Sequence, residues 1–163
     1  MIPRVGIGYD VHPFADGRPL VLGGETLPGL RGLLGHSDAD ALCHALADAV
    51  LGALALGDLG AHFPDTDPRW KGADSLALLA QVAAMAGERG YAVGNVDATV
   101  LAEAPKLAPH VDAMRANLAR ALGIGIAQVS VKATRPEGLG SLGKGEGLAV
   151  WAVALLVPRG TAA

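Results

Sequence analysis

The sequence is poor in cysteine, in aromatic residues and in charge. Cys43 is the only cysteine among 163 residues, so no disulfide can form within the chain. This excludes a small disulfide-stapled scaffold and a cysteine-rich zinc finger. Charged residues make up 18% of the chain, and hydrophobic residues, at 51%, are too abundant for a disordered protein. A chain of this length buries a core of its own, and we expect one domain over residues 1–163.

Basic runs and long hydrophobic runs are also missing. The net charge of −3 argues against a nucleic-acid partner, which needs a phosphate-neutralising surface, but it leaves a small anionic ligand possible. The longest apolar run, residues 148–157, is too short to span a bilayer, which takes about 20 residues. The first residues also do not follow the pattern of a signal peptide. We therefore expect a cytoplasmic protein with no membrane partner.

Hydrophobic periodicity predicts the element order β-β-α-α-β-α-β-β. We expect strands over residues 4–12, 19–24, 91–101, 128–134 and 148–157, with Pro13 ending the first and the last buried on both faces. Helices are expected from Ser37 or Asp38 to Gly57, over 75–89 with Asp74 as N-cap, and after a turn at 105–109. Residues 27–35, 62–72 and 135–147 are expected to be loops. This order predicts an α+β fold, with a mixed, mostly antiparallel sheet and helices packed on one face.

A group of acidic and histidine side chains indicates a metal site. Asp10 and His12 are two residues apart on a predicted strand, so their side chains share a face. His44 lies four residues from both Asp40 and Asp48, which places the three on one helical face. One carboxylate and two imidazoles suit Zn²⁺, with a fourth position left for water or substrate. The alternative is that the strand and the helix never meet, since no spacing rule links Asp10 and His12 to His44.

The glycine-rich segment 138–145 imitates two nucleotide-binding motifs. It satisfies G-x-G-x-x-G and nearly satisfies the phosphate-loop pattern. However, Gly145 replaces the hydroxyl residue that holds Mg²⁺, and a strand pattern follows where both motifs need a helix. We therefore expect neither a Rossmann domain nor a P-loop NTPase. Free backbone N–H groups in this segment remain candidates for contacting a phosphate.

Other polar residues have both a functional and a structural interpretation. His36, Ser37 and Asp38 stand at a predicted helix start, where they either face an anion or cap the helix. Glu137 either reaches a Mg²⁺ bound to phosphates or is simply solvated. Cys43 is expected to pack as a small hydrophobe.

Ten short segments follow one another along the chain, and this ordered set identifies a protein family more specifically than any single segment does. They are residues 8–12, 33–40, 44–48, 57–60, 63–67, 71–75, 94–97, 104–106, 131–134 and 145–147. Together they resemble the 2-C-methyl-D-erythritol 2,4-cyclodiphosphate synthase family, and the resemblance covers about residues 4–157. It implies a homotrimer with active sites at the subunit interfaces.

The resemblance also implies a reaction of the non-mevalonate isoprenoid pathway. In it, 4-diphosphocytidyl-2-C-methyl-D-erythritol 2-phosphate becomes the 2,4-cyclodiphosphate and CMP. The 2-phosphate attacks the β-phosphorus of the same molecule, which makes the enzyme a phosphorus–oxygen lyase that needs no nucleophile of its own.

Roles for individual residues follow from the resemblance. Asp10, His12 and His44 match the zinc ligands, and Glu137 matches the carboxylate on a Mg²⁺ or Mn²⁺ that joins the substrate diphosphate. His36, Arg135 and Glu137 are the implied catalytic residues. The implied substrate contacts fall into groups. Asp58, Leu59 and Gly60 are implied to hold the methylerythritol hydroxyls, with Phe63, Pro64, Asp65, Thr66 and Asp67 along the same pocket. Ala102, Glu103, Ala104, Pro105, Lys106, Leu107 and Ala108 are implied to surround cytosine, and the other implied contacts are Asp10, His12, His36, Ser37, Thr134, Arg135, Pro136, Glu137, Ser141 and Lys144.

Three residues depart from the family pattern. Arg135 replaces a threonine credited with helping the transition state, Ser141 replaces an aromatic residue, and Lys144 replaces an arginine. Arginine also stabilises phosphate charge. Two other functions stay open: a zinc phosphohydrolase that activates water, and a non-catalytic trimeric binding protein with a structural zinc.

Overall fold

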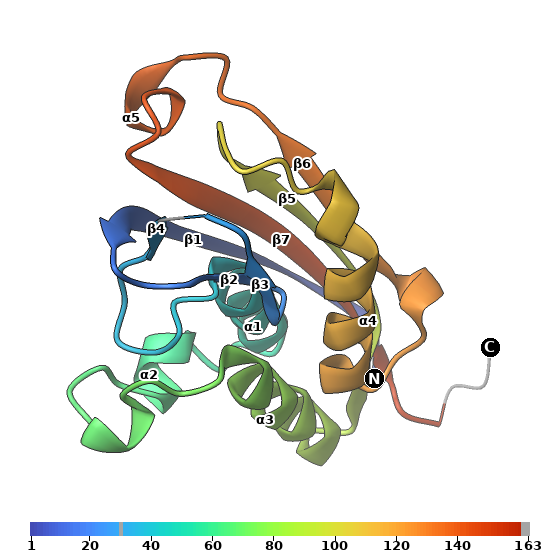
Figure 1. The fold of residues 1–163 in the computed structure, drawn as a ribbon. Coiled ribbons are helices and arrows are strands. Elements are labelled where there is room, and N and C mark those ends of the chain that lie inside the picture. The colour runs from blue at the N-terminus through green and yellow to red at the C-terminus, as the bar shows by residue number, and fades with distance from the viewer. Residues whose placement is uncertain (30, 161–163) are drawn as a thin grey trace.

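Five strands form one mixed sheet in the computed structural model, which describes residues 1–29 and 31–160 (Figure 1). The strand order is β4-β1-β7-β5-β6, with β1 at Arg4–Asp16, β4 at Arg31–Leu33, β5 at Tyr91–Leu101, β6 at Val129–Thr134 and β7 at Gly147–Pro158. Among the strand pairs that the described residues form in this sheet, only β5–β6 is parallel. The predicted mixed, mostly antiparallel sheet is confirmed. Residue 30 of the predicted loop and residues 161–163 of the predicted domain lie outside the described residues.

Three long helices cover one face of this sheet, as predicted (Figure 1). They are α1 at Ala41–Ala53, α3 at Ser75–Glu88 and α4 at Val111–Leu122. Gly6 and Gly8 on β1 allow α1 to lie directly on the strand. A Cβ at Gly6 would stand 1.9 Å from the Ala49 carbonyl oxygen, and one at Gly8 would stand 1.8 Å from that of Ala45. Any larger residue would push α1 away from β1.

The opposite face of the sheet carries exposed apolar side chains. Strand alternation on β1 points Val5, Ile7, Tyr9 and Val11 away from the helices, at exposures from 47% to 69%. Trp151 on β7 pairs with Tyr9, their ring centroids 4.9 Å apart, and is 42% exposed in the single chain. The prediction that the last strand is buried on both faces is therefore wrong, because the helices cover only one.

The first half of the chain forms more strand than we predicted. Pro13 does not end the first strand: it pairs with Gly147, and its carbonyl accepts the N–H of Leu34 at 2.9 Å. Proline lacks only the donor, so the acceptor side of the backbone can still pair. The predicted strand 19–24 is instead a hairpin of β2 (Leu20–Leu22) and β3 (Glu25–Leu27), and β4 lies within the predicted loop 27–35.

The boundaries of α1 also differ from the prediction. Asp40 is the N-cap, accepting from the N–H groups of Leu42 and Cys43, so the helix begins neither at Ser37 nor at Asp38, and it ends at Ala53 rather than Gly57. The Asp40 carboxylate is fully buried and turns toward the β2–β3 hairpin, so it does not share a face with His44. The predicted Asp74 cap of α3 and the burial of Cys43 are confirmed.

The structure also contains short helical elements. Two of them, α5 (Gly140–Gly143) and a 3₁₀ turn at Pro68–Trp70, lie in predicted loops. The others, α2 (Leu59–His62) and 3₁₀ turns at Ala108–His110 and Ile126–Gln128, were not predicted as helical, and the last one moves the start of the strand predicted at 128 to Val129. The strand predicted after the glycine-rich segment is confirmed as β7, so no helix follows that segment. Among the helices of the described residues, none has the length and apolar character needed to span a membrane.

Candidate active site

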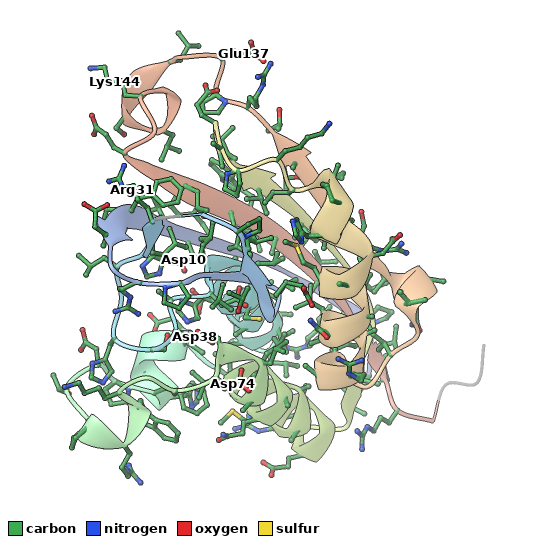
Figure 2. All side chains as sticks on the ribbon, viewed as in Figure 1. Asp10, Arg31, Asp38, Asp74, Glu137 and Lys144 are labelled. Carbon is green, nitrogen blue, oxygen red and sulfur yellow. The ribbon has the colours of Figure 1, made fainter. Side chains whose placement is uncertain are left out.

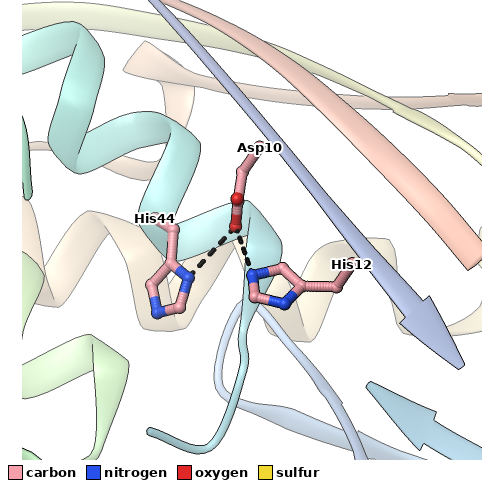
Figure 3. Close-up of side chains that lie close together, drawn as sticks. All are labelled: Asp10, His12 and His44. Carbon is pink, nitrogen blue, oxygen red and sulfur yellow. Dashed lines mark hydrogen bonds and ion pairs between the residues drawn. The ribbon is translucent and has the colours of Figure 1, made fainter. Parts of the chain in front are cut away.

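Asp10, His12 and His44 lie together where β1 passes over α1 (Figure 3). Asp10 and His12 share the face of β1 that Gly6 and Gly8 keep close to the helix. The Asp10 Oδ2 atom lies 2.9 Å from His12 Nε2 and 3.1 Å from His44 Nδ1. One ligand atom from each residue falls within 4.8 Å of the others. The predicted grouping of these three side chains is confirmed.

The charges of this group reinforce one another. Burial raises the pKa of Asp10, but the hydrogen bonds and charges of His12 and His44 outweigh burial and lower this pKa from 3.8 to about 2. Burial lowers the pKa of His12, but Asp10 and the Leu34 carbonyl outweigh it and raise the pKa above 6.5. Asp10 is therefore ionised at neutral pH and presents a carboxylate to any cation.

The donor set fits a metal ion. One carboxylate and two imidazoles match the ligands that Zn²⁺ takes at catalytic sites, where three protein groups leave a fourth position open. The His12 Nδ1 atom lies 2.6 Å from the Leu34 carbonyl oxygen, to which its N–H donates, so Nε2 is left to face the ligand position.

The three residues line a cleft of about 510 Å³. This metal cleft also contains His36, Ser37, Leu59, Gly60, Phe63, Pro64 and Asp65, all of them predicted substrate contacts. Three predicted contacts do not line it. Asp58 caps α2 through the N–H of Ala61, Asp67 caps the next turn and pairs with Arg69, and Thr66 lies between them in sequence. Asp58 and Asp67 therefore stabilise the short helical turns next to the cleft, and they do not line it.

Arg18 holds the segment that carries His36 and Ser37, a role that no motif in the sequence marks. Its guanidinium donates to the carbonyl oxygens of Gly35 and Ser37, both at 2.8 Å. The Gly72 N–H donates to the carbonyl oxygen between them, that of His36, at 2.8 Å. Residues 35–38, called the strap here, are irregular backbone, and these bonds keep them in a fixed shape next to the metal cleft.

Four further residues of the cleft, Gly35, Asp48, Trp70 and Leu78, were missing from the predicted substrate contacts, and two of them make defined contacts. Asp48 accepts the Leu59 N–H at 2.7 Å and so positions the start of α2, and burial raises its pKa. Its place one helical turn after His44 was the available signal. Trp70 packs edge-on to Phe63, with ring centroids 5.0 Å apart, and had no motif to mark it.

The remaining predicted contacts gather elsewhere. A second cleft of about 600 Å³ lies between the end of β5 and the end of β6. It is called the nucleotide cleft here only because the contacts that the resemblance implies for cytosine gather in it. Its lining includes Ala102, Glu103, Pro105, Lys106, Leu107, Ala108, Thr134, Arg135 and Glu137. Ala104 and Pro136 do not line it, and Ser141 and Lys144 lie beyond it in the α5 turn.

The two clefts of one chain have no lining residue in common. Figure 2 shows Glu137 and Lys144 at the loop end of the molecule, well away from Asp10. Arg135 and Glu137 therefore do not face the metal cleft of their own chain.

Comparison with known proteins places the chain in a family. The pattern of the YgbB family matches residues 3–157. The chain belongs to this family. A YgbB relative from Geobacter metallireducens, named 2-C-methyl-D-erythritol 2,4-cyclodiphosphate synthase, is 61% identical over 156 residues, which cover 96% of this chain and 99% of that protein.

Solved structures of similar proteins have the same fold. The bifunctional IspDF from Campylobacter jejuni superposes with a TM-score of 0.91 at 43% identity, over 94% of this chain and 42% of that longer one. IspF from Plasmodium falciparum, solved as a CDP complex, superposes with a TM-score of 0.84 at 32% identity, over 96% of this chain and 97% of that one. The sequence resemblance to the cyclodiphosphate synthases is confirmed.

Proposed function

We propose that this chain converts 4-diphosphocytidyl-2-C-methyl-D-erythritol 2-phosphate into 2-C-methyl-D-erythritol 2,4-cyclodiphosphate and CMP, in non-mevalonate isoprenoid biosynthesis. The observation that carries the proposal is the match to cyclodiphosphate synthases over nearly the whole chain. The Asp10, His12 and His44 group, which lines a cleft, supports it. The reaction class is that of a phosphorus–oxygen lyase. The cytoplasmic location of the protein stays a prediction from the sequence.

The proposed reaction requires the protein to hold its substrate in a folded conformation, because the nucleophile is a phosphate of the substrate itself. An oxygen of the 2-phosphate forms a bond to the β-phosphorus, and the bond from that phosphorus to the oxygen it shares with the α-phosphate breaks. CMP leaves with that oxygen, so atoms and charges balance without an added nucleophile or water. His36 and Ser37 hold the 2-phosphate, and Arg135 stabilises the charge that gathers on the diphosphate.

Metal ions complete this proposal. Asp10, His12 and His44 would hold one Zn²⁺ per subunit, and Glu137 would hold a Mg²⁺ or Mn²⁺ with the substrate diphosphate, since such ions are bound by one or two carboxylates plus phosphate oxygens. When bound, these cations act as Lewis acids toward the phosphoryl oxygens. Three protein ligand groups that line an open cleft favour a catalytic zinc over a structural one, because structural sites usually take four protein ligands.

A homotrimer would bring the two clefts together. Each chain carries a metal cleft and a nucleotide cleft at separate places, so a complete site takes the metal cleft of one copy and the nucleotide cleft of the next. The uncovered sheet face around Ile7, Tyr9 and Trp151 offers the apolar surface for this association. Cytosine would lie against the 102–108 loop, where backbone groups can read its edge.

Phosphorus NMR of the cytidine diphosphate substrate with purified protein tests the proposal. We expect CMP and a cyclic diphosphate, and no turnover after a chelator removes the metal. CMP with an open-chain diphosphate would mean that water is the nucleophile, and would make the protein a phosphohydrolase. No turnover with zinc present would instead indicate a binding protein.

A further inference from the structure

His44 presents its two ring nitrogens to different neighbours. Nδ1 faces Asp10 on the side of the metal cleft, at 3.1 Å. Nε2 faces the interior, 2.9 Å from Ser75 Oγ and 3.1 Å from Ser37 Oγ. A neutral imidazole binds a metal through the nitrogen that has no proton, so binding through Nδ1 requires the proton on Nε2.

The direction of the hydrogen bonds around Ser75 selects that form of the ring. Asp38 accepts the Ser75 hydroxyl proton with Oδ1 and the Ser75 N–H with Oδ2, the latter at 3.1 Å. A carboxylate only accepts, so the single proton of this hydroxyl is committed to Asp38. The Ser75 oxygen can then only accept from His44 Nε2–H. Ser75 is 1% exposed, so water does not compete for these bonds.

Ser37 is at a similar distance from His44 Nε2 but has no such constraint. Its oxygen accepts the Ala39 N–H at 3.1 Å, and no carboxylate among the described residues takes its proton. The Ser37 hydroxyl is therefore free to donate to His44 or to accept from it. Of the two hydroxyls that touch His44, only Ser75 distinguishes between the two tautomers.

We propose that Asp38 and Ser75 are positioning residues that fix the tautomer and the ring orientation of His44, and that they thereby raise the affinity of the Asp10, His12 and His44 group for a divalent metal. The proposal deepens the proposed function and rests on it. Neither residue lines the metal cleft, so neither acts by touching substrate. Ser75 is the first residue of α3 and follows its Asp74 cap. Asp38 comes from the strap, and Figure 2 shows it on the same side of the molecule as Asp74.

A purely structural role makes a different prediction. Asp38 also ties the strap to α3 through its own N–H, which donates to the Ala73 carbonyl at 3.1 Å, and through the Ser75 N–H. Ser75→Ala keeps both of these backbone ties and removes only the hydroxyl. A structural role would therefore lower the melting temperature of the metal-free protein without a specific effect on the metal.

The experiment measures the zinc dissociation constant by competition with a chelator, in full-length wild type, Ser75→Ala, Ser75→Thr, Ser37→Ala and His44→Ala. The melting temperature of each metal-free protein is measured alongside. We expect Ser75→Ala to weaken zinc binding by roughly 10- to 100-fold, the usual cost of losing a partner of a metal-bound histidine. Ser37→Ala keeps the Ser75 hydroxyl, and Ser75→Thr keeps a hydroxyl in the same place. Both variants should therefore bind zinc nearly as wild type does.

Each outcome has a separate meaning. Equal zinc affinity in wild type and His44→Ala would overturn the metal site itself, and with it the metal part of the proposed function. Loss in His44→Ala with none in Ser75→Ala would overturn only the positioning role. Equal losses in Ser75→Ala and Ser75→Thr would also overturn it, since packing rather than the hydroxyl would then be responsible.

Discussion

At the scale of single residues, Arg135 is the departure with the clearest chemical consequence. It lines the nucleotide cleft with Glu137, in a position where the resemblance leads us to expect a threonine. A guanidinium offers several donors to phosphate oxygens and keeps its charge at every relevant pH. In our proposed mechanism it takes over the stabilisation of charge on the diphosphate.

We predict that Arg135→Met lowers kcat/KM by roughly 10- to 150-fold, because a hydrogen bond to a charged group contributes about 1.5–3 kcal/mol. Steady-state assay of CMP release measures this. Arg89→Met, which removes an arginine at the end of α3, serves as the control and should leave the rate unchanged. Equal rates for both variants would show that Arg135 does not contact the reacting phosphates.

A second residue-scale prediction concerns the ion pair of Asp97 on β5 with Lys132 on β6. The hydrogen bond from Lys132 holds the pKa of Asp97 below 3.8. A carboxyl group with a lowered folded-state pKa stabilises the protein above pH 3.8, and this contribution disappears as the pH falls through the folded-state value.

Asp97→Asn should therefore lower the free energy of unfolding by about 0.5 kcal/mol at pH 7, a small effect because the pair is exposed. The difference in stability between the variant and the wild type should shrink as the pH falls below 3.8 through the folded-state pKa of Asp97. Urea unfolding over a series of pH values gives the comparison, and a loss that does not change with pH would rule out the ion pair as its cause.

At the scale of elements, Asp40 joins the start of α1 to the β2–β3 hairpin. Its carboxylate accepts the N–H groups of Leu42 and Cys43 at the helix end and those of Gly23 and Gly24 at the hairpin turn. The same helix start carries His44 toward Asp10. The buried cap thus connects local helix formation with the placement of a metal ligand.

Asp40→Ala should destabilise the protein by about 3 kcal/mol, since it removes an N-cap and leaves buried N–H groups unpaired. Chemical denaturation of the metal-free protein measures this change. Asp74→Ala, at the exposed cap of α3, is the matched control and should cost only about 1 kcal/mol. Equal losses for the two variants would mean that the hairpin bonds of Asp40 contribute nothing.

At the scale of the whole molecule, the uncovered sheet face and the two separate clefts make one prediction together. If copies associate through this face, then Trp151→Glu places a charge in the interface and the oligomer dissociates. CMP release should be lost, because the nucleotide cleft then no longer meets a metal cleft. Zinc binding should remain, because Asp10, His12 and His44 all belong to one chain.

Analytical ultracentrifugation, zinc content and CMP release are measured on the same Trp151→Glu sample. Ile126→Glu changes an exposed apolar residue outside the sheet and should leave all three properties as in wild type. An active Trp151→Glu monomer would show that one chain holds a complete site.

The sequence by itself determined what depends on covalent spacing. The alternation of β1 placed Asp10 and His12 on one face, helical periodicity located α3 and α4, and the ordered segments identified the family. Local patterns fix such features because they depend only on the geometry of neighbouring residues.

Only the tertiary structure decided what depends on residues far apart in the chain. The close approach of α1 to β1 at Gly6 and Gly8 brings His44 to Asp10. The β2–β3 hairpin packs over the start of α1, so that the Asp40 cap is buried. Arg18 bonds to Gly35, 17 residues further along the chain, and Ser75 bonds to His44, 31 residues before it. No period in the sequence encodes such contacts, because packing of helices on one sheet face, and not on the other, selects them.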